Sequence, residues 1–386
     1  MKEEKLFLKF LYHCARNIKD DDLSTLNLDK FIKTSSINRV SNILYYGVKN
    51  KLKENIKISN ENLEQIKSEC MVFGVKELKQ QMEFSKIENA FKNANIKMIA
   101  MKGIVLKNLY SSKDMRVMGD IDMIVDQKDY LLARDILINK LNYKVNNEDL
   151  VELCATNNQN VTVELHQHLV TELSNNQKYF DDTYKDNIIL TGLHYEFTHT
   201  YHFIYMMDHI YKHFIEGGLS LKYILDFALY IEKYPSVIKD TLGELNKLSL
   251  SNITLGFLQI CRDFLDMNVE ENISIFDKKI NEDAIKTLLL LMIQHGEYGT
   301  VESRVNAKTV QGTFFKRILR RLFPPVIRPK HRSKILEIII YPFRLLGIWF
   351  GYFLMNLKYV FFVFKQKSQL SDSEKNKLSN MYNEMK

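Results

Sequence analysis

The chain has 386 residues, of which 46% are hydrophobic, and it carries a formal net charge of +7. This length suffices for two or three domains, and the hydrophobic content excludes wholesale disorder. The charge is mild and its excess is local to the C-terminal part, so it does not by itself argue for nucleic acid. The four cysteines are too far apart in sequence for a CxxC or metal-knuckle motif, and we expect a reducing cytoplasm.

Residues 1–95 are expected to form helices. Apolar residues recur there at helical spacing, first between Leu6 and Leu11 and last in a long pattern over residues 61–95. The apolar run at the N-terminus is too short and too interrupted for a signal peptide. No chemical motif stands out, so we expect these helices to cover a sheet or to present a substrate surface.

The stretch Lys97–Asp126 predicts a strand, a turn, a helix, a loop and a second strand. An apolar run from Ile96 to Met101 suits a buried strand, and Lys102-Gly103 forms the turn after it. Glycine permits close backbone approach, and a helix that begins there offers free N–H groups to an anion. The positive charge of Lys102 adds to this predicted phosphate site.

The second strand carries Asp120 and Asp122, one residue apart. Side chains two apart on a strand point to the same face, and like charges held that close repel unless a cation lies between them. Mg²⁺ or Mn²⁺ suits such a pair, because hard divalent ions prefer carboxylate oxygens. Arg116 and Gly119 lie just before the pair, so a second positive charge can enter the same cleft. The phosphate site and the acid-bearing strand are about 20 residues apart, as one βαβ-like unit would place them.

Residues 127–166 predict a helix and then strands, at Tyr143–Val145, Leu150–Ala155 and Val161–His166. The last of these alternates apolar and polar residues, which puts Glu164 on a polar face. We take Glu164 as the candidate third carboxylate, because a site that holds two metal ions needs a further acid to bridge and position them. The alternative is an exposed glutamate on an edge strand. His166 fits equally a substrate contact or a hydrogen-bonded structural group.

From about Gln177 the pattern indicates helices throughout. His209 and His213 lie four apart on one helix, so they share a face. Such a pair can bind a transition metal, although no further ligand is spaced to complete a known zinc motif. A polar spine within an aromatic-rich helix pair explains the two residues equally well. Gly217-Gly218 predicts the end of this helix.

The C-terminal stretch differs from the rest of the chain. Residues 316–334 hold eight Lys and Arg residues, and residues 335–364 are strongly apolar, with Glu337, Arg344 and Lys358 as interruptions. This combination fits a helix on an anionic membrane surface, or a helix packed in a groove of this protein or of a partner. A true membrane span is the weakest alternative, because the uncharged piece is too short. The polar tail from Lys365 is expected to fray.

Taken together, these residues resemble the nucleotidyltransferase superfamily, and most closely its little-characterised bacterial branch. That branch has a Lys-Gly turn, an arginine and a Gly-Asp-x-Asp strand, which read here as Lys102-Gly103, Arg116 and Gly119 to Asp122. The superfamily's usual turn is Gly-Ser, so Lys102 is given part of the role of holding the triphosphate. The likeness runs from about residue 80 to about residue 235.

The resemblance implies an α+β fold, with a small mixed β-sheet, flanking helices and a mostly helical C-terminal part. It implies a third acid just before a Leu-His pair, here Glu164 before Leu165-His166, and a later helix pair that lines the nucleotide cleft. The implied catalytic and metal-binding residues are Asp120, Asp122 and Glu164. The implied nucleotide-binding residues are Lys102, Gly103, Arg116, Gly119, His209, His213 and Asp226.

We therefore expect four regions: N-terminal helices at 1–95, a catalytic core at 96–175, a helical domain at 176–310 and a basic and apolar region at 311–386. The expected activity is metal-dependent transfer of a nucleoside monophosphate from a nucleoside triphosphate to an unidentified hydroxyl acceptor, with a possible link to surface polysaccharide synthesis. The alternatives are a toxin-like enzyme that modifies RNA or protein, and a catalytically inactive nucleotide-binding scaffold at the membrane surface. The expected location is the cytoplasm, with peripheral contact to the inner face of the membrane as a further option. A nucleic-acid-binding module is weaker, because prolines break the basic stretch.

Overall fold

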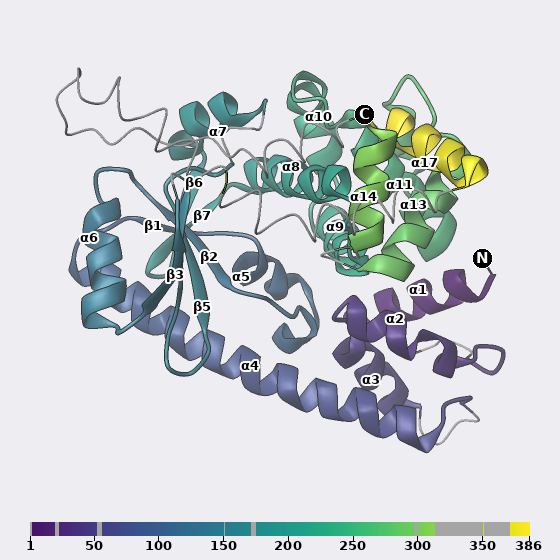
Figure 1. Cartoon of the computed structure of the whole chain (residues 1–386), viewed down its shortest axis with the longest axis horizontal. Helices are drawn as coiled ribbons and strands as arrows, with labels where there is room; N and C mark the ends of the chain where they lie inside the picture. Colours follow the sequence, from purple (N-terminus) through teal and green to yellow (C-terminus); the bar gives the residue numbers. More distant parts are fainter. Residues whose placement is uncertain are drawn as a thin grey trace. The chain divides into compact units, whose positions relative to one another are not determined.

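The computed structural model describes residues 2–19, 23–51, 56–149, 151–170, 175–296, 299, 301–312, 350 and 371–386 (Figure 1). It is an α+β structure in which one mixed sheet is flanked by helices, as the sequence predicted. The strands are β1 (Met98–Ala100), β2 (Ile121–Val125), β3 (Lys144–Glu148), β4 (Glu152–Thr156), β5 (Thr162–His166), β6 (Ile188–Thr191) and β7 (His194–Phe197).

Helices make up most of the remaining described chain. The helices before the end of the sheet are α1 (Lys2–Ala15), α2 (Ile32–Ile37), α3 (Ser41–Asn50), α4 (Asn60–Asn93), α5 (Gly103–Leu106), α6 (Tyr130–Asp135) and α7 (Gln177–Thr183). Those that follow it are α8 (His199–Glu216), α9 (Leu221–Lys233), α10 (Val237–Lys247), α11 (Ser251–Leu265), α12 (Glu270–Ser274), α13 (Glu282–His295), α14 (Val301–Val310) and α17 (Asp372–Met385).

The sheet has seven strands in the order β3-β4-β5-β2-β1-β7-β6. The pairs β2–β5 and β1–β7 are parallel, and the other neighbours are antiparallel. The acid-bearing strand β2 therefore lies at the centre. A central strand has both of its edges hydrogen-bonded, which fixes its side chains firmly in place.

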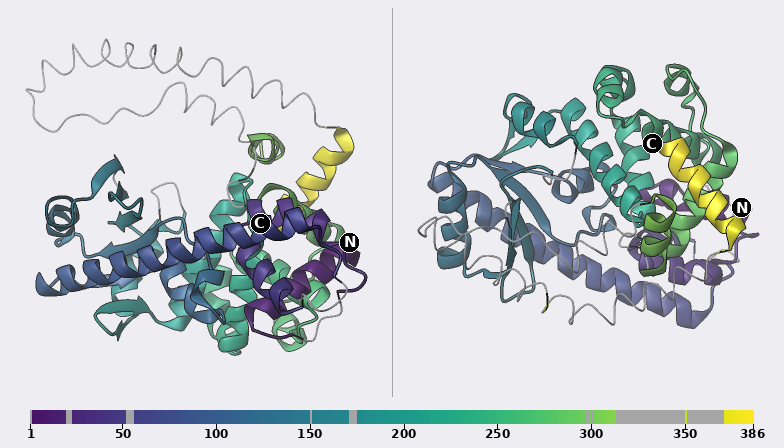
Figure 2. Two further views of the ribbon diagram at one scale, coloured as in Figure 1. Left: turned by 90° about the horizontal axis from the view of Figure 1, so that it is seen from below. Right: turned by 45° about the horizontal axis from the view of Figure 1, so that its top comes forward.

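One face of the sheet forms the core. Ile121, Met123 and Val125 of β2 are fully buried there, as their alternation with the carboxylates predicts. The C-terminal half of α4, through Phe84, Ile87 and Phe91, covers this face, together with α6. Figures 1 and 2 show α4 as a single long helix that reaches from the sheet to the bundle of α1, α2 and α3. The polar side chains of β2 and β5 consequently point to the opposite face.

Two predictions about the sheet are wrong. Residues after Gln177 are not all helical, because Ile188–Thr191 and His194–Phe197 form a hairpin that extends the sheet. A run of β-branched residues and Gly192, whose φ is +65°, supply the strand and turn signals. The segment Lys97–Asp126 is not a βαβ unit, because β1 and β2 pair antiparallel. The helix α5 between them is a single turn, so it does not form a parallel crossover.

The chain divides into two compact units. The first contains residues 1–211 and 220–280, and hence the whole sheet with α9 to α12. The second contains residues 212–219 and 281–386, and hence the end of α8 with α13, α14 and α17. Gly217, at the end of α8, has φ of +81°, which confirms the predicted helix stop.

The polar C-terminal tail is not frayed, contrary to the prediction. Ser371 and Glu374 form a reciprocal capping box at the start of α17, and Met381, Tyr382 and Met385 on its inner side are buried. Among the described helices, none combines the length and the apolar composition that a membrane span requires. Apart from Phe350, the segment 316–364 lies outside the described residues, so its predicted membrane contact stays a prediction.

Candidate functional site

The site is built on the parallel pairing of β2 with β5. In this register Asp122 is directly opposite Glu164, and Ile124 is opposite His166. Opposed residues on neighbouring strands have adjacent side chains on the same face. One oxygen of Asp122, one of Glu164 and one nitrogen of His166 lie within 4.8 Å of one another, a grouping that suits a metal ion. Two of the three predicted metal ligands therefore fall together, and His166 takes the third place in this group.

The turn after β1 brings a lysine to the same acids. Nζ of Lys102 lies 2.6 Å from Oδ1 of Asp122, and both side chains are largely buried. The backbone of Lys102 has φ of +49° and ψ of −121°, a conformation that favours glycine and is costly for a residue with a Cβ. The turn is therefore strained at the one residue whose charge it delivers to the site.

His166 contacts carboxylates through both of its ring nitrogens. Its Nε2 lies 3.3 Å from Oδ1 of Asp122 and 3.7 Å from Oε2 of Glu164. Its Nδ1 lies 3.2 Å from Oε2 of Glu152, which belongs to β4 and is opposite His166 in the β4–β5 register. Hydrogen bonds to Asp122 and Glu164 outweigh the effect of burial and raise the pKa of His166 to about 9. Without a metal ion the imidazolium form is therefore favoured, so His166 acts here as a cation rather than as a metal ligand.

The two aspartates respond to this environment in opposite directions. Burial, followed by the charges of Asp122 and Glu164, raises the pKa of Asp120 to about 7. Burial also disfavours ionised Asp122, but the charge of Lys102 and the hydrogen bond from His166 hold its pKa well below the usual range. Asp122 therefore stays ionised. At Asp120 the nearby positive charge does not offset burial and the charges of the two neighbouring carboxylates.

The donor set suits a divalent cation. Asp120, Asp122, Glu164 and Glu152 gather here, and the pKa of Glu152 is also raised, chiefly by burial. Lys102 contacts Asp122, and His166 contacts Asp122 and Glu152, while the positive charge of Lys222 also acts on Asp120. Oxygen-rich, negatively charged groups of this kind are what Mg²⁺ and Mn²⁺ prefer. We therefore take Asp120, Asp122 and Glu164 as the residues that would hold the ion.

Gly103 is needed for packing within the site. A Cβ on this glycine would lie 2.5 Å from Cγ of Met118, whose side chain is buried. Because Met118 lies two residues before Asp120, the close contact fixes the turn against the loop that carries the acid. Nζ of Lys76 on α4 donates to the carbonyl oxygen of Gly119, 3.2 Å away, and so holds the same loop at the residue after Met118.

Two further predicted residues meet in a buried ion pair. Nε of Arg116 lies 2.7 and 2.9 Å from the two carboxylate oxygens of Asp226 on α9. The hydroxyl of Tyr110 donates to Oδ1 of Asp226 over 2.8 Å. Burial and the charge of Asp226 raise the pKa of Tyr110, so it stays a donor. The pair joins α9 to the loop before Asp120, although 110 residues separate its members.

The predicted histidine pair is divided between the two units. His209 lies edge-on to the ring of Tyr223, with centroids 6.0 Å apart, inside the first unit. His213 belongs to the second unit. That His209 and His213 contact the nucleotide therefore remains a prediction.

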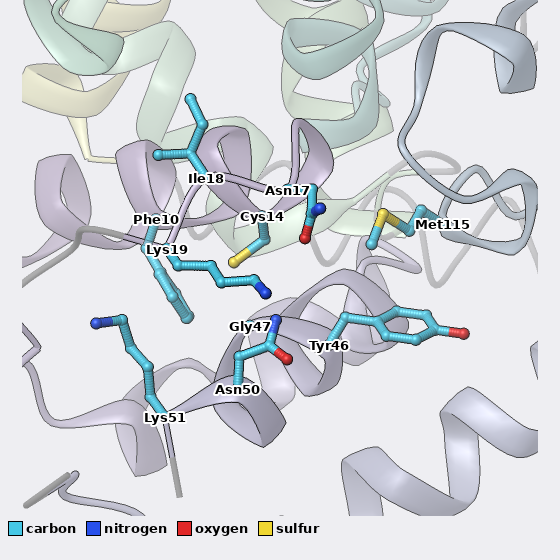
Figure 3. Close-up of a pocket in the computed structure, with 10 residues that line it drawn as sticks. All are labelled: Phe10, Cys14, Asn17, Ile18, Lys19, Tyr46, Gly47, Asn50, Lys51 and Met115. Atoms are coloured by element: carbon cyan, nitrogen blue, oxygen red, sulfur yellow. The ribbon is translucent and has the colours of Figure 1, made fainter. Parts of the chain in front are cut away.

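A surface pocket lies elsewhere in the first unit (Figure 3). It is lined chiefly by α1, α3 and the segment after α1, and Met115 closes one side. Lys19 and Lys51 line it from two different segments, and in Figure 3 the side chain of Lys19 extends toward Asn50. None of the predicted site residues lines this pocket, so it takes no part in the site.

Sequence reasoning missed Glu152 and Tyr110 and left the role of His166 open. A signal for Glu152 was available, because the predicted hairpin places it on the polar face beside the end of β5. The link from Tyr110 and Arg116 to Asp226 had no local signal, since these residues meet only through the tertiary fold.

A mixed sheet with an Asp-x-Asp segment, a neighbouring acid-bearing strand and a Lys-Gly turn is the arrangement that the resemblance to the nucleotidyltransferase superfamily implied. Residues 24–266, well over half of the chain, match the model of a family described as an uncharacterised nucleotidyltransferase. The chain belongs to this family. No curated protein and no solved structure matches the chain. Membership supports a transferase that uses a nucleoside triphosphate.

Proposed function

We propose that this protein transfers a nucleoside monophosphate from a nucleoside triphosphate to a hydroxyl acceptor in a reaction that needs Mg²⁺ or Mn²⁺. The observation that carries the proposal is the register of β2 and β5, which brings Asp122 opposite Glu164 beside an Asp120 of raised pKa. A bound divalent ion would supply Lewis-acid polarisation of the phosphates and of the attacking hydroxyl.

The residues of the chain divide the remaining work. Asp120, Asp122 and Glu164 hold the ion, and Glu164, which is half-buried, takes the proton of the acceptor hydroxyl. The acceptor oxygen then forms a bond to the α-phosphorus as the bond to the bridging oxygen breaks, and pyrophosphate leaves. Lys102 lies at the turn and offsets charge on the phosphates. We assign Arg116 and Asp226 to holding the loop of Asp120 in place.

The test is Asp122→Asn in the full chain, assayed with labelled nucleoside triphosphates and Mg²⁺. We expect transfer and metal-dependent nucleotide binding to fall at least about 1,000-fold, as for other losses of a charged catalytic group. Asp126→Asn is the matched control, because Asp126 follows the same strand but pairs with Lys185 at the surface. Unchanged nucleotide binding in Asp122→Asn would overturn the proposal.

The acceptor class is a finer part of the proposal. We place a soluble sugar or sugar phosphate of surface polysaccharide synthesis first, and RNA or protein second. Incubating the active protein with one labelled nucleotide and, in turn, sugars, transfer RNA and the protein alone distinguishes these acceptors. Tight Mg-nucleotide binding with no transfer to any of them would favour the inactive scaffold.

A further inference from the structure

Lys222 is a buried lysine to which the proposed reaction assigns no role. It lies in the first turn of α9 and is 4% exposed. The first turn of a helix carries partial positive charge, so a cation there is unfavourable, and removing an ammonium from water costs further free energy. Nζ of Lys222 lies 5.6 Å from the centroid of the Tyr223 ring, an attraction that offsets part of this cost. Helix stability therefore does not explain a lysine at this position.

The side of α9 that carries Lys222 packs toward the loop before the metal-binding strand. Asp226 lies four residues after Lys222, and residues four apart share one face of a helix. Asp226 binds Arg116 and Tyr110, which both belong to the segment between the Lys-Gly turn and β2. The helix also packs against Lys107–Leu109 of that segment. Lys222 is therefore on the face of α9 that points toward the loop of the Asp-x-Asp pair.

Buried hydrogen bonds fix the beginning of α9. Oγ of Ser220 donates to the carbonyl oxygen of Asn38 over 3.1 Å, and the N–H of Leu221 donates to Oδ1 of Asn38 over 2.8 Å. Ser220 and Asn38 are both almost fully buried. The backbone at Lys222, two residues after Ser220, is therefore held in place before any ligand binds.

Two lysines from different elements act on the metal-binding acids. Nζ of Lys102, at the turn after β1, contacts Asp122, and the charge of Lys222, on α9, acts on Asp120. Glu164 adds a third carboxylate to the same group. The cluster thus offers carboxylates to an ion and two ammonium groups to phosphates.

We propose that Lys222 is a second phosphate-binding lysine, which donates to the triphosphate of the nucleotide alongside Lys102. This inference rests on the proposed function, because it concerns the same site. A nucleoside triphosphate brings several negative charges next to the carboxylates, and a divalent ion cancels only part of them. When Asp120 is compensated by the ion, Lys222 donates to a phosphate oxygen. The contact adds affinity for phosphates and none for the base or the ribose.

The experiment is isothermal titration calorimetry of the full chain in Mg²⁺. The probes are the common ribonucleoside triphosphates, inorganic triphosphate, and the nucleoside of the triphosphate that binds best. Lys222→Met removes the charge and keeps the apolar stem, so it leaves no large cavity. We expect it to weaken the binding of both triphosphate probes about 10- to 100-fold, the loss of one charge-assisted hydrogen bond, and to leave nucleoside binding within about twofold.

Further variants separate the charge of the side chain from its position. Lys222→Arg keeps the charge and should retain triphosphate binding within about fivefold. Lys222→Gln removes the charge by a second route and serves if circular dichroism shows that Lys222→Met does not fold. Lys233→Met is the matched control, because Lys233 lies on the same helix and also contacts a tyrosine ring, that of Tyr234 at 5.4 Å, but is exposed. It should leave the affinity for every probe unchanged.

The outcomes distinguish this inference from the proposed function. Unchanged triphosphate affinity without the charge of Lys222 would overturn the inference, and so would an equal loss for triphosphate and nucleoside, which indicates a role in folding alone. If the wild type binds triphosphates but transfers nothing, the proposed reaction fails, while the titrations still decide the role of Lys222. If the wild type binds no triphosphate at all, both proposals are overturned.

Discussion

Two buried aspartates, Asp122 on β2 and Asp226 on α9, are used in different ways. Asp226 is fully buried, and a guanidinium and a phenol hydroxyl bind its two oxygens. Asp122 also has two cationic partners, but Glu164 and Asp120 lie beside it and add charge that those partners do not neutralise.

The difference separates a structural ion pair from a site prepared for a ligand. A buried ion pair whose charges cancel stabilises the fold only while both partners are present. Removing one partner leaves an uncompensated buried charge. A crowded group of carboxylates costs stability until a cation arrives, which is the arrangement expected where function takes precedence over stability. The two clusters should therefore respond to substitution with opposite signs.

Asp226→Asn gives the largest expected effect on stability. It leaves Arg116 buried without its carboxylate, so we expect a loss of about 3–5 kcal/mol in the free energy of unfolding. Denaturant titration measures this. Glu232→Gln is the control on the same helix, because Glu232 pairs with Arg16 at the surface and should cost less than about 1 kcal/mol. Equal costs for the two variants would remove the distinction between the clusters.

Asp120→Asn should stabilise the metal-free protein while it abolishes transfer. The folded pKa of Asp120, about 7, is above the unfolded value near 3.9, so the folded state binds the proton more tightly. Protonated Asp120 therefore stabilises the folded state fully below about pH 4. This stabilisation, a few kcal/mol in the free energy of unfolding, is lost as the pH rises through 7. Thermal unfolding in EDTA at several pH values should show this slope in the wild type and a flatter one in the variant. A variant less stable than the wild type at pH 8 would contradict the assignment.

Mg²⁺ should stabilise the folded protein by binding at Asp122 and not at the Asp226 ion pair. At about 100 times its dissociation constant, an ion that binds only the folded state adds roughly 2.7 kcal/mol. We expect the midpoint of thermal unfolding to rise with Mg²⁺ in the wild type and in Asp126→Asn, but not in Asp122→Asn. A rise in all three would place the ion elsewhere.

The turn at Lys102 gives the smallest expected difference. Lys102→Ala and Lys102→Gly both remove the amine from Asp122, but only glycine adopts a positive φ without strain. We expect the glycine variant to be more stable than the alanine variant by about 1 kcal/mol, and both to lose nucleotide affinity. Equal stability would mean that the backbone at this position carries no strain.

Much of the core could be predicted from the sequence because the patterns that indicate it are local. Alternation along β2 and β5 predicted which residues face the core, and the Lys-Gly turn and Asp-x-Asp strand marked the site. The fold class followed from the same patterns together with the resemblance. The hairpin of β6 and β7 also had a local signal, in its β-branched run and Gly192, but aromatic-rich helices on its C-terminal side drew the assignment toward helix.

Contacts between distant segments could not be read in this way. Nothing near Arg116 in the sequence indicates that it pairs with Asp226, and nothing near Gly103 indicates that Met118 leaves no room for a Cβ. Both follow from packing across the tertiary structure, where the partner is set by the whole fold rather than by neighbours in sequence.

The parallel pairing of β7 with β1 determines where the chain can be cut. A fragment that ends at residue 175, the boundary expected for the catalytic core, lacks β7 and leaves β1 as an open edge next to Lys102. Exposed strand edges recruit other chains, so such a fragment should aggregate rather than act as a minimal enzyme. On the ribosome the same edge stays open until residue 197 has emerged, which makes the strand before the Lys-Gly turn one of the last parts of the sheet to be completed.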